Sequence, residues 1–116
     1  MSQEFSVDVD KLEDGFVLVT IHGFLDAHTF EQMENTFNQL FDEEEYQIIV
    51  ELSDVPYISS AGAGVFIGAV GTSQDADGNI VMLNPQANVK EVFDLLGLTQ
   101  IFSFSSDIES ARKLFE

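Results

Sequence analysis

The sequence predicts an α/β fold, with a small mixed sheet of about four to five strands and about four helices packed against it. Two observations lead to this expectation. From residue 47 onward, short apolar runs typical of strands alternate with segments of helical spacing. Parallel neighbours in a sheet need such helical crossovers, whereas the first two strand-like runs are joined by a short turn and should pair antiparallel. The predicted sheet is therefore mixed.

The N-terminal region is expected to form a β-hairpin. Residues 5–9 alternate apolar and polar side chains, as in a strand with one exposed face. Residues 16–21 are more apolar and form the second predicted strand, which Gly23 ends. Residues 13–15 supply the turn, in which Gly15 is free to take a positive φ.

An amphipathic helix should follow, with Asp26 or Thr29 as its N-cap. Its apolar residues recur at i, i+3, i+7, i+10 and i+11, a spacing that predicts one core-facing stripe. The three glutamates at 43–45 are expected to form a solvated turn, because adjacent carboxylates point in different directions. The stripe consists of Phe30, Met33, Phe37, Leu40 and Phe41.

The centre of the chain combines a strand, a short loop and a helix. Residues 48–52 begin as a β-branched apolar run, which suits a strand buried on both faces. Pro56 disfavours helical backbone before it, so the helix begins later, with Ser59 or Ser60 as the natural N-cap. The helix is expected over residues 61–71 and should be largely buried, because it is apolar nearly all round.

Three glycines of this helix, Gly62, Gly64 and Gly68, should allow close approach of neighbouring backbone. A polar loop is expected over residues 72–78, followed by a strand over residues 79–83.

The C-terminal part predicts a short amphipathic helix stopped by Gly97 and an edge strand over residues 101–104. A last helix should begin with Ser106 and Glu109 as a capping box. The inward-facing residues of these two helices are expected to be Val89, Val92, Phe93 and Leu96, and Ile108, Ala111, Leu114 and Phe115.

Composition argues against several classes of partner. The 116 residues include 21 acidic and 4 basic side chains, a formal net charge of −17. Nucleic acid and anionic membranes both require clustered cations, so neither is an expected partner. The acidity favours solubility, or steering toward a basic surface on a protein partner. Because the chain has no cysteine, disulfides and thiolate metal sites are impossible.

The chain is expected to be one domain, residues 1–116, in the cytoplasm. A hydrophobic fraction of 45% supports a packed core. No apolar run reaches membrane-spanning length, and the first residues lack the basic and apolar regions of a signal peptide.

Nucleotide-binding motifs are incomplete. Residues 62–64 begin like a dinucleotide-binding fingerprint, but Ile67 stands where the third glycine belongs, and the glycines fall inside a predicted helix. A P-loop is excluded, since the chain has no Gly-Lys-Ser or Gly-Lys-Thr triplet.

Catalytic and metal motifs are also incomplete. The serine pair lacks the preceding glycine of a nucleophile elbow. His22 and His28 can reach these serines in space, so hydrolysis is left as a minor alternative. The two histidines have no convergent carboxylate, and residues 75–78 lack most ligands of a calcium loop. No catalytic residue, metal or cofactor is therefore expected.

What remains is a hydroxyl at a helix N-terminus, which is either an ordinary cap or a modification site. Phosphorylation would add a charge of roughly −1.5 to −2 there. At a protein interface that charge would be desolvated or would face carboxylates of the partner, so one phosphate can dissociate a complex with little change in fold.

Three segments together resemble the STAS family, named after sulphate transporters and anti-sigma factor antagonists. The likeness spans essentially the whole chain, and the predicted order of elements matches the family's fold. A STAS-like fold is therefore expected, with residues 1–116 as a single STAS domain. The segments are Gly23-Phe24-Leu25-Asp26, Leu52-Ser53-Asp54-Val55-Pro56-Tyr57-Ile58-Ser59-Ser60-Ala61-Gly62 and Leu95-Leu96-Gly97-Leu98.

The resemblance implies a bacterial partner-switching protein, an anti-sigma factor antagonist. In its unphosphorylated form such a protein binds an anti-sigma factor that is also a serine kinase, and thereby releases the sigma factor. The kinase phosphorylates the antagonist at a serine, and a metal-dependent serine phosphatase reverses the modification. The family's phosphorylated residue falls on Ser60, and its aspartate after the Gly-x-Leu turn falls on Asp26.

Two positions depart from the family pattern. Many members have Asp just before the phosphorylated serine, where this chain has Ser59, and Ser or Thr after it, where this chain has Ala61. Ser59 is therefore an alternative acceptor.

We expect a non-enzymatic switch, a monomer or weak dimer, that binds its partner through the start of the central helix. The alternative is an unphosphorylated scaffold subunit of a lipid-transport or stress-signalling assembly. The expected partner-binding residues are Phe24, Asp26, Tyr57, Ser59, Ser60, Gly62 and Ala63.

Overall fold

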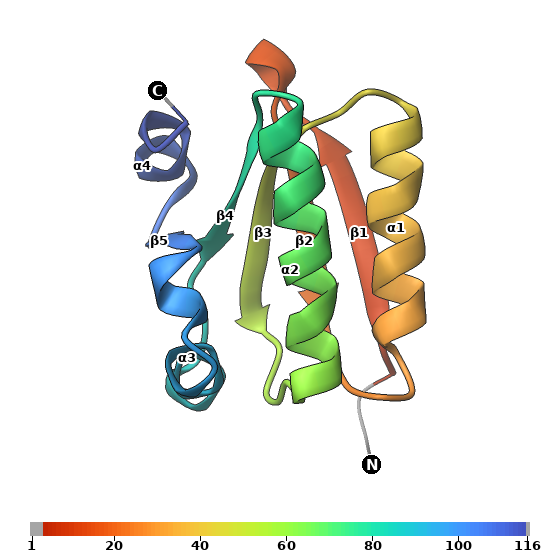
Figure 1. Ribbon diagram of the computed structural model, residues 1–116, viewed down its shortest axis with the longest axis vertical. Helices are drawn as coiled ribbons and strands as arrows, with labels where there is room; N and C mark the ends of the chain where they lie inside the picture. The colour runs from red at the N-terminus through yellow and green to blue at the C-terminus, as the bar shows by residue number, and fades with distance from the viewer. Residues whose placement is uncertain (1–3, 116) are drawn as a thin grey trace.

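Five strands form one mixed sheet in the order β1-β2-β3-β4-β5 (Figure 1). The computed structural model describes residues 4–115. β1 pairs antiparallel with β2, and the remaining neighbours are parallel. The predicted hairpin and the predicted mixed sheet are both confirmed. The strands are β1 (Ser6–Lys11), β2 (Val17–His22), β3 (Gln47–Asp54), β4 (Asn79–Leu83) and β5 (Ser103–Ser105).

In the described part of the chain, four α-helices pack against the sheet, as expected. α1 and α2 lie side by side on one face, and both run from the lower end to the upper end in Figure 1. Each fills the crossover between parallel strands, which is the connection that parallel pairing requires. The helices are α1 (Phe30–Asp42), α2 (Ser60–Asp75), α3 (Ala87–Leu95) and α4 (Ile108–Lys113), with short 3₁₀ turns η1 (Glu13–Gly15) and η2 (Leu98–Gln100).

Apolar residues on opposite faces of the sheet belong to two cores. Ile48, Val50 and Leu52 of β3 join the main core, which also holds the stripe of α1 and residues of α2 and α3. Ile49 points to the other face, where α4 covers it with Ala111. All of these β3 side chains are fully buried, so the expected strand with two buried faces is confirmed.

The central helix differs from its prediction in length and in burial. α2 continues to Asp75, so most of the predicted loop at 72–78 is helical, because Ser73 continues the buried face of the helix. The opposite face is exposed: Ile67 is 45% accessible, and Gly64 and Gly68 are also exposed. The expected burial therefore holds for the inner face of the helix alone, because α2 lies in the outer layer with no further element over it.

The remaining differences between the predicted and the observed elements lie at helix ends. α4 begins with Asp107 as N-cap, whose Oδ1 accepts a hydrogen bond from Ser110 N at 2.7 Å, and the predicted capping box of Ser106 and Glu109 is wrong. Leu96 and Leu114 are 45% and 42% exposed instead of inward-facing, because each lies just beyond the end of its helix.

Candidate functional site

The loops that follow β2 and β3 lie side by side at the lower end of the sheet in Figure 1. Leu25 N donates to Tyr57 O at 3.1 Å, and Ser59 N donates to Leu25 O at 2.9 Å. Leu25 and Ile58 thus form an isolated parallel bridge, and both side chains are buried. Parallel pairing between β2 and β3 therefore resumes in the loops, which brings residues 23–26 beside residues 57–60.

Gly62 fixes how α2 lies on these loops. A Cβ at this position would come 2.5 Å from Leu25 O and 2.9 Å from Leu25 Cγ. Such contacts are too short for any side chain, so the first turn of α2 requires glycine here. The predicted close approach is confirmed at Gly62, but not at Gly64 or Gly68, where a Cβ would meet nothing within 4 Å.

The two neighbouring serines have different environments. Ser59 is the N-cap of α2, with extended backbone, and its Oγ accepts from Gly62 N at 3.2 Å. Ser60 is the first helical residue and is exposed. Within residues 4–115 its hydroxyl has no hydrogen-bond partner. Of the two hydroxyls, that of Ser59 stabilises the helix and that of Ser60 is available to other molecules.

An exposed aromatic pair lies on the same two loops. Phe24 and Tyr57 are 46% and 47% exposed, and their rings meet edge to face with centroids 5.9 Å apart. Large apolar side chains of this kind, exposed next to one another, are typical of protein interaction surfaces.

Asp26 shapes the turn that leads into α1. Its Oδ1 accepts from His28 N at 2.9 Å, while its backbone N–H donates to Thr29 Oγ1 at 2.9 Å. Thr29, the N-cap position of α1, makes no capping bond to the helix, and its hydroxyl instead donates to Phe24 O at 2.8 Å. These bonds hold the backbone of residues 24–29 in one turn.

The structure thus brings together five of the seven predicted partner-binding residues on adjoining loops: Phe24, Asp26, Tyr57, Ser59 and Ser60. Gly62 and Ala63 lie in the first turn of α2, but both are buried. Gly62 packs against Leu25 of the first loop, and neither residue exposes a side chain at the surface.

His22, at the end of β2, links the stems of both loops through two aspartates. His22 Nδ1 lies 2.6 Å from Asp54 Oδ2, and His22 Nε2 lies 3.1 Å from Asp8 Oδ2. Gly23 N also donates to Asp54 O. The hydrogen bond to Asp54, followed by that to Asp8, raises the pKa of His22 above its usual 6.5. Both ring nitrogens of His22 contact carboxylates, so hydrolysis gains no support from this residue.

The start of α3 fastens the second loop. Asn88 Nδ2 donates to Pro56 O at 2.6 Å, and Gln86 Nε2 donates to Ser53 O at 3.0 Å. The sequence separation of these pairs is above 30 residues, so no local pattern could have revealed them. Their effect is to hold three successive strand-to-helix connections in one cluster.

Among residues 4–115, no cluster of three or more His, Cys, Asp or Glu side chains can hold a metal ion. No helix in this part of the chain is long and apolar enough to cross a bilayer.

The fold and the loop cluster define a small α/β domain with an exposed serine at the start of its central helix. The chain matches the STAS domain family over residues 9–111 and belongs to that family. It is 28% identical over 108 residues to a putative anti-sigma factor antagonist, BtrV, of Bordetella bronchiseptica, covering 93% of this chain and 92% of the relative. The anti-sigma-B factor antagonist of Staphylococcus epidermidis is 27% identical over 96 residues, with 83% and 89% coverage.

Solved structures support the fold. The anti-sigma factor antagonist SpoIIAA in its unphosphorylated form superposes with a TM-score of 0.79 and 22% identity, over 94% of this chain and 96% of that one. SpoIIAA of Bacillus in the phosphorylated form gives a TM-score of 0.73 with 20% identity, over 94% and 99%. The expected STAS-like architecture is thereby confirmed.

Proposed function

We propose that this protein is an anti-sigma factor antagonist that acts as a phosphorylation-dependent switch. In this proposal the unphosphorylated form binds an anti-sigma factor that is also a serine kinase, and phosphorylation of Ser60 ends the binding. The observation that carries the proposal is the exposed, uncommitted hydroxyl of Ser60 beside the aromatic pair Phe24–Tyr57. The names of the two bacterial relatives point to the same class of function.

The geometry favours Ser60 over Ser59 as the acceptor. Ser59 is half-buried, and its Oγ is engaged with Gly62 N. A kinase would have to break this capping bond, which is worth about 1 kcal/mol in typical helices, before it could reach the hydroxyl. Ser60 needs no such rearrangement, because its side chain is already exposed at the first helical position.

A phosphate on Ser60 would leave the fold intact and change the surface. The helix dipole offsets negative charge at this position by about 0.3 to 1 kcal/mol. Within residues 4–115, no hydrogen bond or ion pair made by Lys or Arg reaches residues 23–29 or 55–62, so the charge would stay at the surface unpaired. Desolvating it against a partner is costly, and every 1.4 kcal/mol lowers the affinity about tenfold.

Two further parts of the proposal are the role of Asp26 and the removal of the phosphate. Asp26 keeps the first loop in the turn that presents Phe24. We assign removal of the phosphate to a metal-dependent serine phosphatase that restores binding.

The test measures phosphorylation and affinity with the same variants. The purified protein is incubated with ATP and a serine kinase of the anti-sigma factor class, and the site is mapped by mass spectrometry. Phosphate is expected on the wild type and on Ser59→Ala, and not on Ser60→Ala. In titration calorimetry, Ser60→Asp should bind the kinase at least about tenfold more weakly, whereas the uncharged control Ser60→Asn keeps most of the affinity.

Two outcomes would contradict the proposal. Equal affinity of Ser60→Asp and Ser60→Asn would show that charge at this position does not control binding. A protein that its kinase never modifies, yet which stays bound in a complex, would indicate a constitutive scaffold subunit instead.

A further inference from the structure

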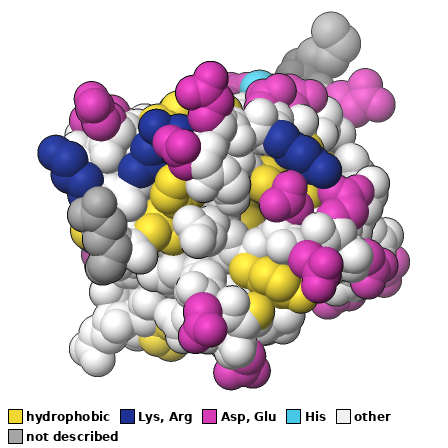
Figure 2. Space-filling model, turned by 90° about the horizontal axis from the view of Figure 1, so that it is seen from above, with side chains coloured by type: hydrophobic (Ala, Val, Ile, Leu, Met, Phe, Trp, Pro, Cys, Tyr) yellow, Lys and Arg dark blue, Asp and Glu magenta, His cyan; other side chains and the backbone are white. Residues whose placement is uncertain are grey.

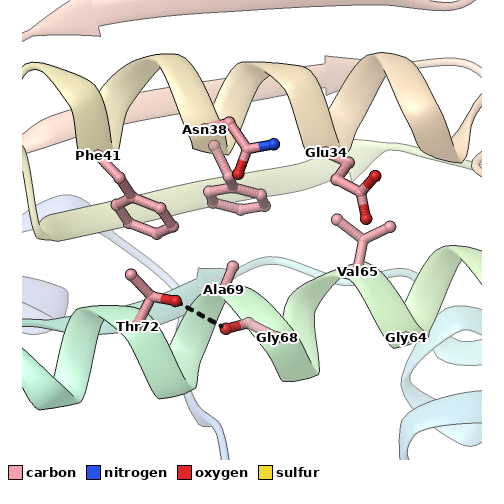
Figure 3. A pocket seen from close by; sticks show the side chains of 9 residues that line it. Glu34, Asn38, Phe41, Gly64, Val65, Gly68, Ala69 and Thr72 are labelled. Carbon is pink, nitrogen blue, oxygen red and sulfur yellow. Dashed lines mark hydrogen bonds between the residues drawn. The ribbon is translucent and has the colours of Figure 1, made fainter.

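A groove of about 290 Å³ lies between α1 and α2, and neither Phe24 nor Tyr57 lines it. Figure 3 shows the side chains that do. Phe37 and Phe41 line it from α1, and Gly64 and Gly68 line it from α2. The two rings stack with centroids 6.1 Å apart and an interplanar angle of 18°. Phe37 is almost fully buried beneath the groove, and Phe41 is half-buried, so part of the lining is apolar and accessible.

The groove is open because two positions of α2 lack side chains. A Cβ on Gly64 or Gly68 would meet nothing within 4 Å, and neither residue takes a positive φ. Glycine inside a helix is less stable than alanine, and here neither packing nor backbone geometry requires it. A neighbouring molecule can therefore approach the backbone of α2 between the two helices.

The charge of this region selects the kind of occupant. Glu34 lies at one end of the groove, near Val65, and within residues 4–115 it forms no ion pair. The ion pairs of Lys11, Lys90 and Arg112 lie elsewhere, with other acids. With a net charge of −17, the chain repels anionic ligands and a second copy of itself, and it attracts basic segments.

We propose that this groove docks a basic amphipathic helix of a partner protein. The lining extends over residues 34–41 of α1 and 64–72 of α2, which corresponds to about 11 to 12 Å, or roughly two helical turns. An aliphatic side chain of the partner helix lies against the phenylalanines between Gly64 and Gly68, and a Lys or Arg faces Glu34. Recognition of this kind, in which the apolar side of a helix enters a groove, is common among protein complexes.

The docking site goes beyond the phosphorylation switch and does not depend on it. Ser60 is the first residue of α2, whereas the groove begins one turn later and faces α1. A partner can therefore use the groove whether or not Ser60 carries a phosphate, for example to keep the switch within a larger assembly.

The test follows backbone amide shifts of the full chain by NMR while a peptide is added. The probe is a stapled synthetic helix of about 14 residues, with Leu at i, i+3, i+4 and i+7 and Lys at the remaining positions. The amide signals of Gly64, Gly68 and Thr72 are expected to shift, and the shifts should saturate as the peptide concentration rises. The same helix with Glu in place of Lys should not bind.

Three variants separate docking from general charge attraction. Gly68→Leu fills the groove and should weaken binding at least about tenfold, while Gly71→Leu should leave it unchanged. Gly71 is a matched control, because its Cβ also meets nothing within 4 Å and it does not line the groove. Glu34→Gln, which adds no bulk, should weaken binding a few-fold at low salt and less at high salt.

The proposal is overturned if no saturable shifts appear, or if shifts spread over the acidic surface and persist in Gly68→Leu. It is likewise overturned if Gly68→Leu and Gly71→Leu weaken binding equally. Ser60→Asp should leave peptide binding unchanged, so this result and the kinase titration can fail independently.

Discussion

The two ends of the sheet satisfy their polar and charged groups in different ways. At the upper end, Lys11 Nζ lies 2.8 Å from Glu43 Oε1, and Arg112 lies over the Phe16 ring and 3.7 Å from Asp14. Figure 2 looks onto this end and shows Lys and Arg side chains among Asp and Glu side chains. At the lower end, Ser60 has no partner among the described residues, and Phe24 and Tyr57 are exposed.

This difference separates stability from recognition. At the upper end, Lys11 and Arg112 pair with acids of the same chain. At the lower end, the contacts of Leu25 and Gly62 and the hydrogen bonds of His22 hold the backbone of both loops, while the Ser60 hydroxyl has no partner among the described residues and the rings of Phe24 and Tyr57 are exposed. A fixed backbone that presents unpaired groups is the arrangement that binding with little conformational cost requires.

The largest expected effect comes from the contact that holds the lower end together. Gly62→Ala places a Cβ 2.5 Å from Leu25 O and should lower the free energy of unfolding by about 1 to 3 kcal/mol. Gly64→Ala, in the same helix but in open space, should raise it by about 0.5 to 1 kcal/mol. Urea denaturation of both variants measures the contrast, and equal effects would mean that the Leu25 contact is unimportant.

The next effect distinguishes the two serines. Ser59→Ala removes the capping hydroxyl of α2 and should lower the free energy of unfolding by about 1 kcal/mol. Ser60→Ala removes a hydroxyl without a partner and should change it by less than about 0.5 kcal/mol. Thermal unfolding by circular dichroism compares the two, and a larger loss for Ser60→Ala would reverse their assigned roles.

The free energy of unfolding should depend on pH through the hydrogen bonds of His22 to Asp54 and Asp8, which link the stems of the two loops. The pKa of His22 is raised in the folded protein, so its contribution to stability is fully present below the ordinary value of 6.5. That contribution should be lost as the pH rises through the raised folded-state value.

Urea midpoints of the wild type, of His22→Gln and of the control His28→Gln, measured as a function of pH, test the role of these hydrogen bonds. His22→Gln should flatten the profile above about pH 6.5, and His28→Gln should not, because the His28 side chain forms no hydrogen bond or ion pair among the described residues. An unchanged profile in His22→Gln would show that the bonds to Asp54 and Asp8 do not respond to protonation of the ring.

The smallest effect is expected at the upper end. Lys11→Gln breaks the pairs with Glu43 and Glu45, but Lys11 and Glu43 are exposed and Glu45 is half-buried, so salt screens both pairs. Urea midpoints should hardly move, and the change should vanish in high salt. A loss as large as that of Gly62→Ala would mean that the upper end, too, depends on specific contacts.

The sequence alone determined most of the elements and predicted a candidate site at the start of the central helix. Alternation and apolar runs identified the strands, and the stripe of α1 identified its buried face, because these periodicities follow from local geometry. The run from Leu52 to Gly62 placed two serines at the start of a helix and carried the resemblance to the STAS family.

The tertiary structure decided which groups are free. Packing of Gly62 on Leu25 sets where α2 begins, so that Ser59 caps the helix and Ser60 is exposed. His22 contacts Asp54, which is 32 residues away in the sequence. The outer face of α2 is exposed because no further layer of the fold covers it. Local patterns record the preferences of a segment, whereas burial and pairing depend on residues that only the folded chain brings together.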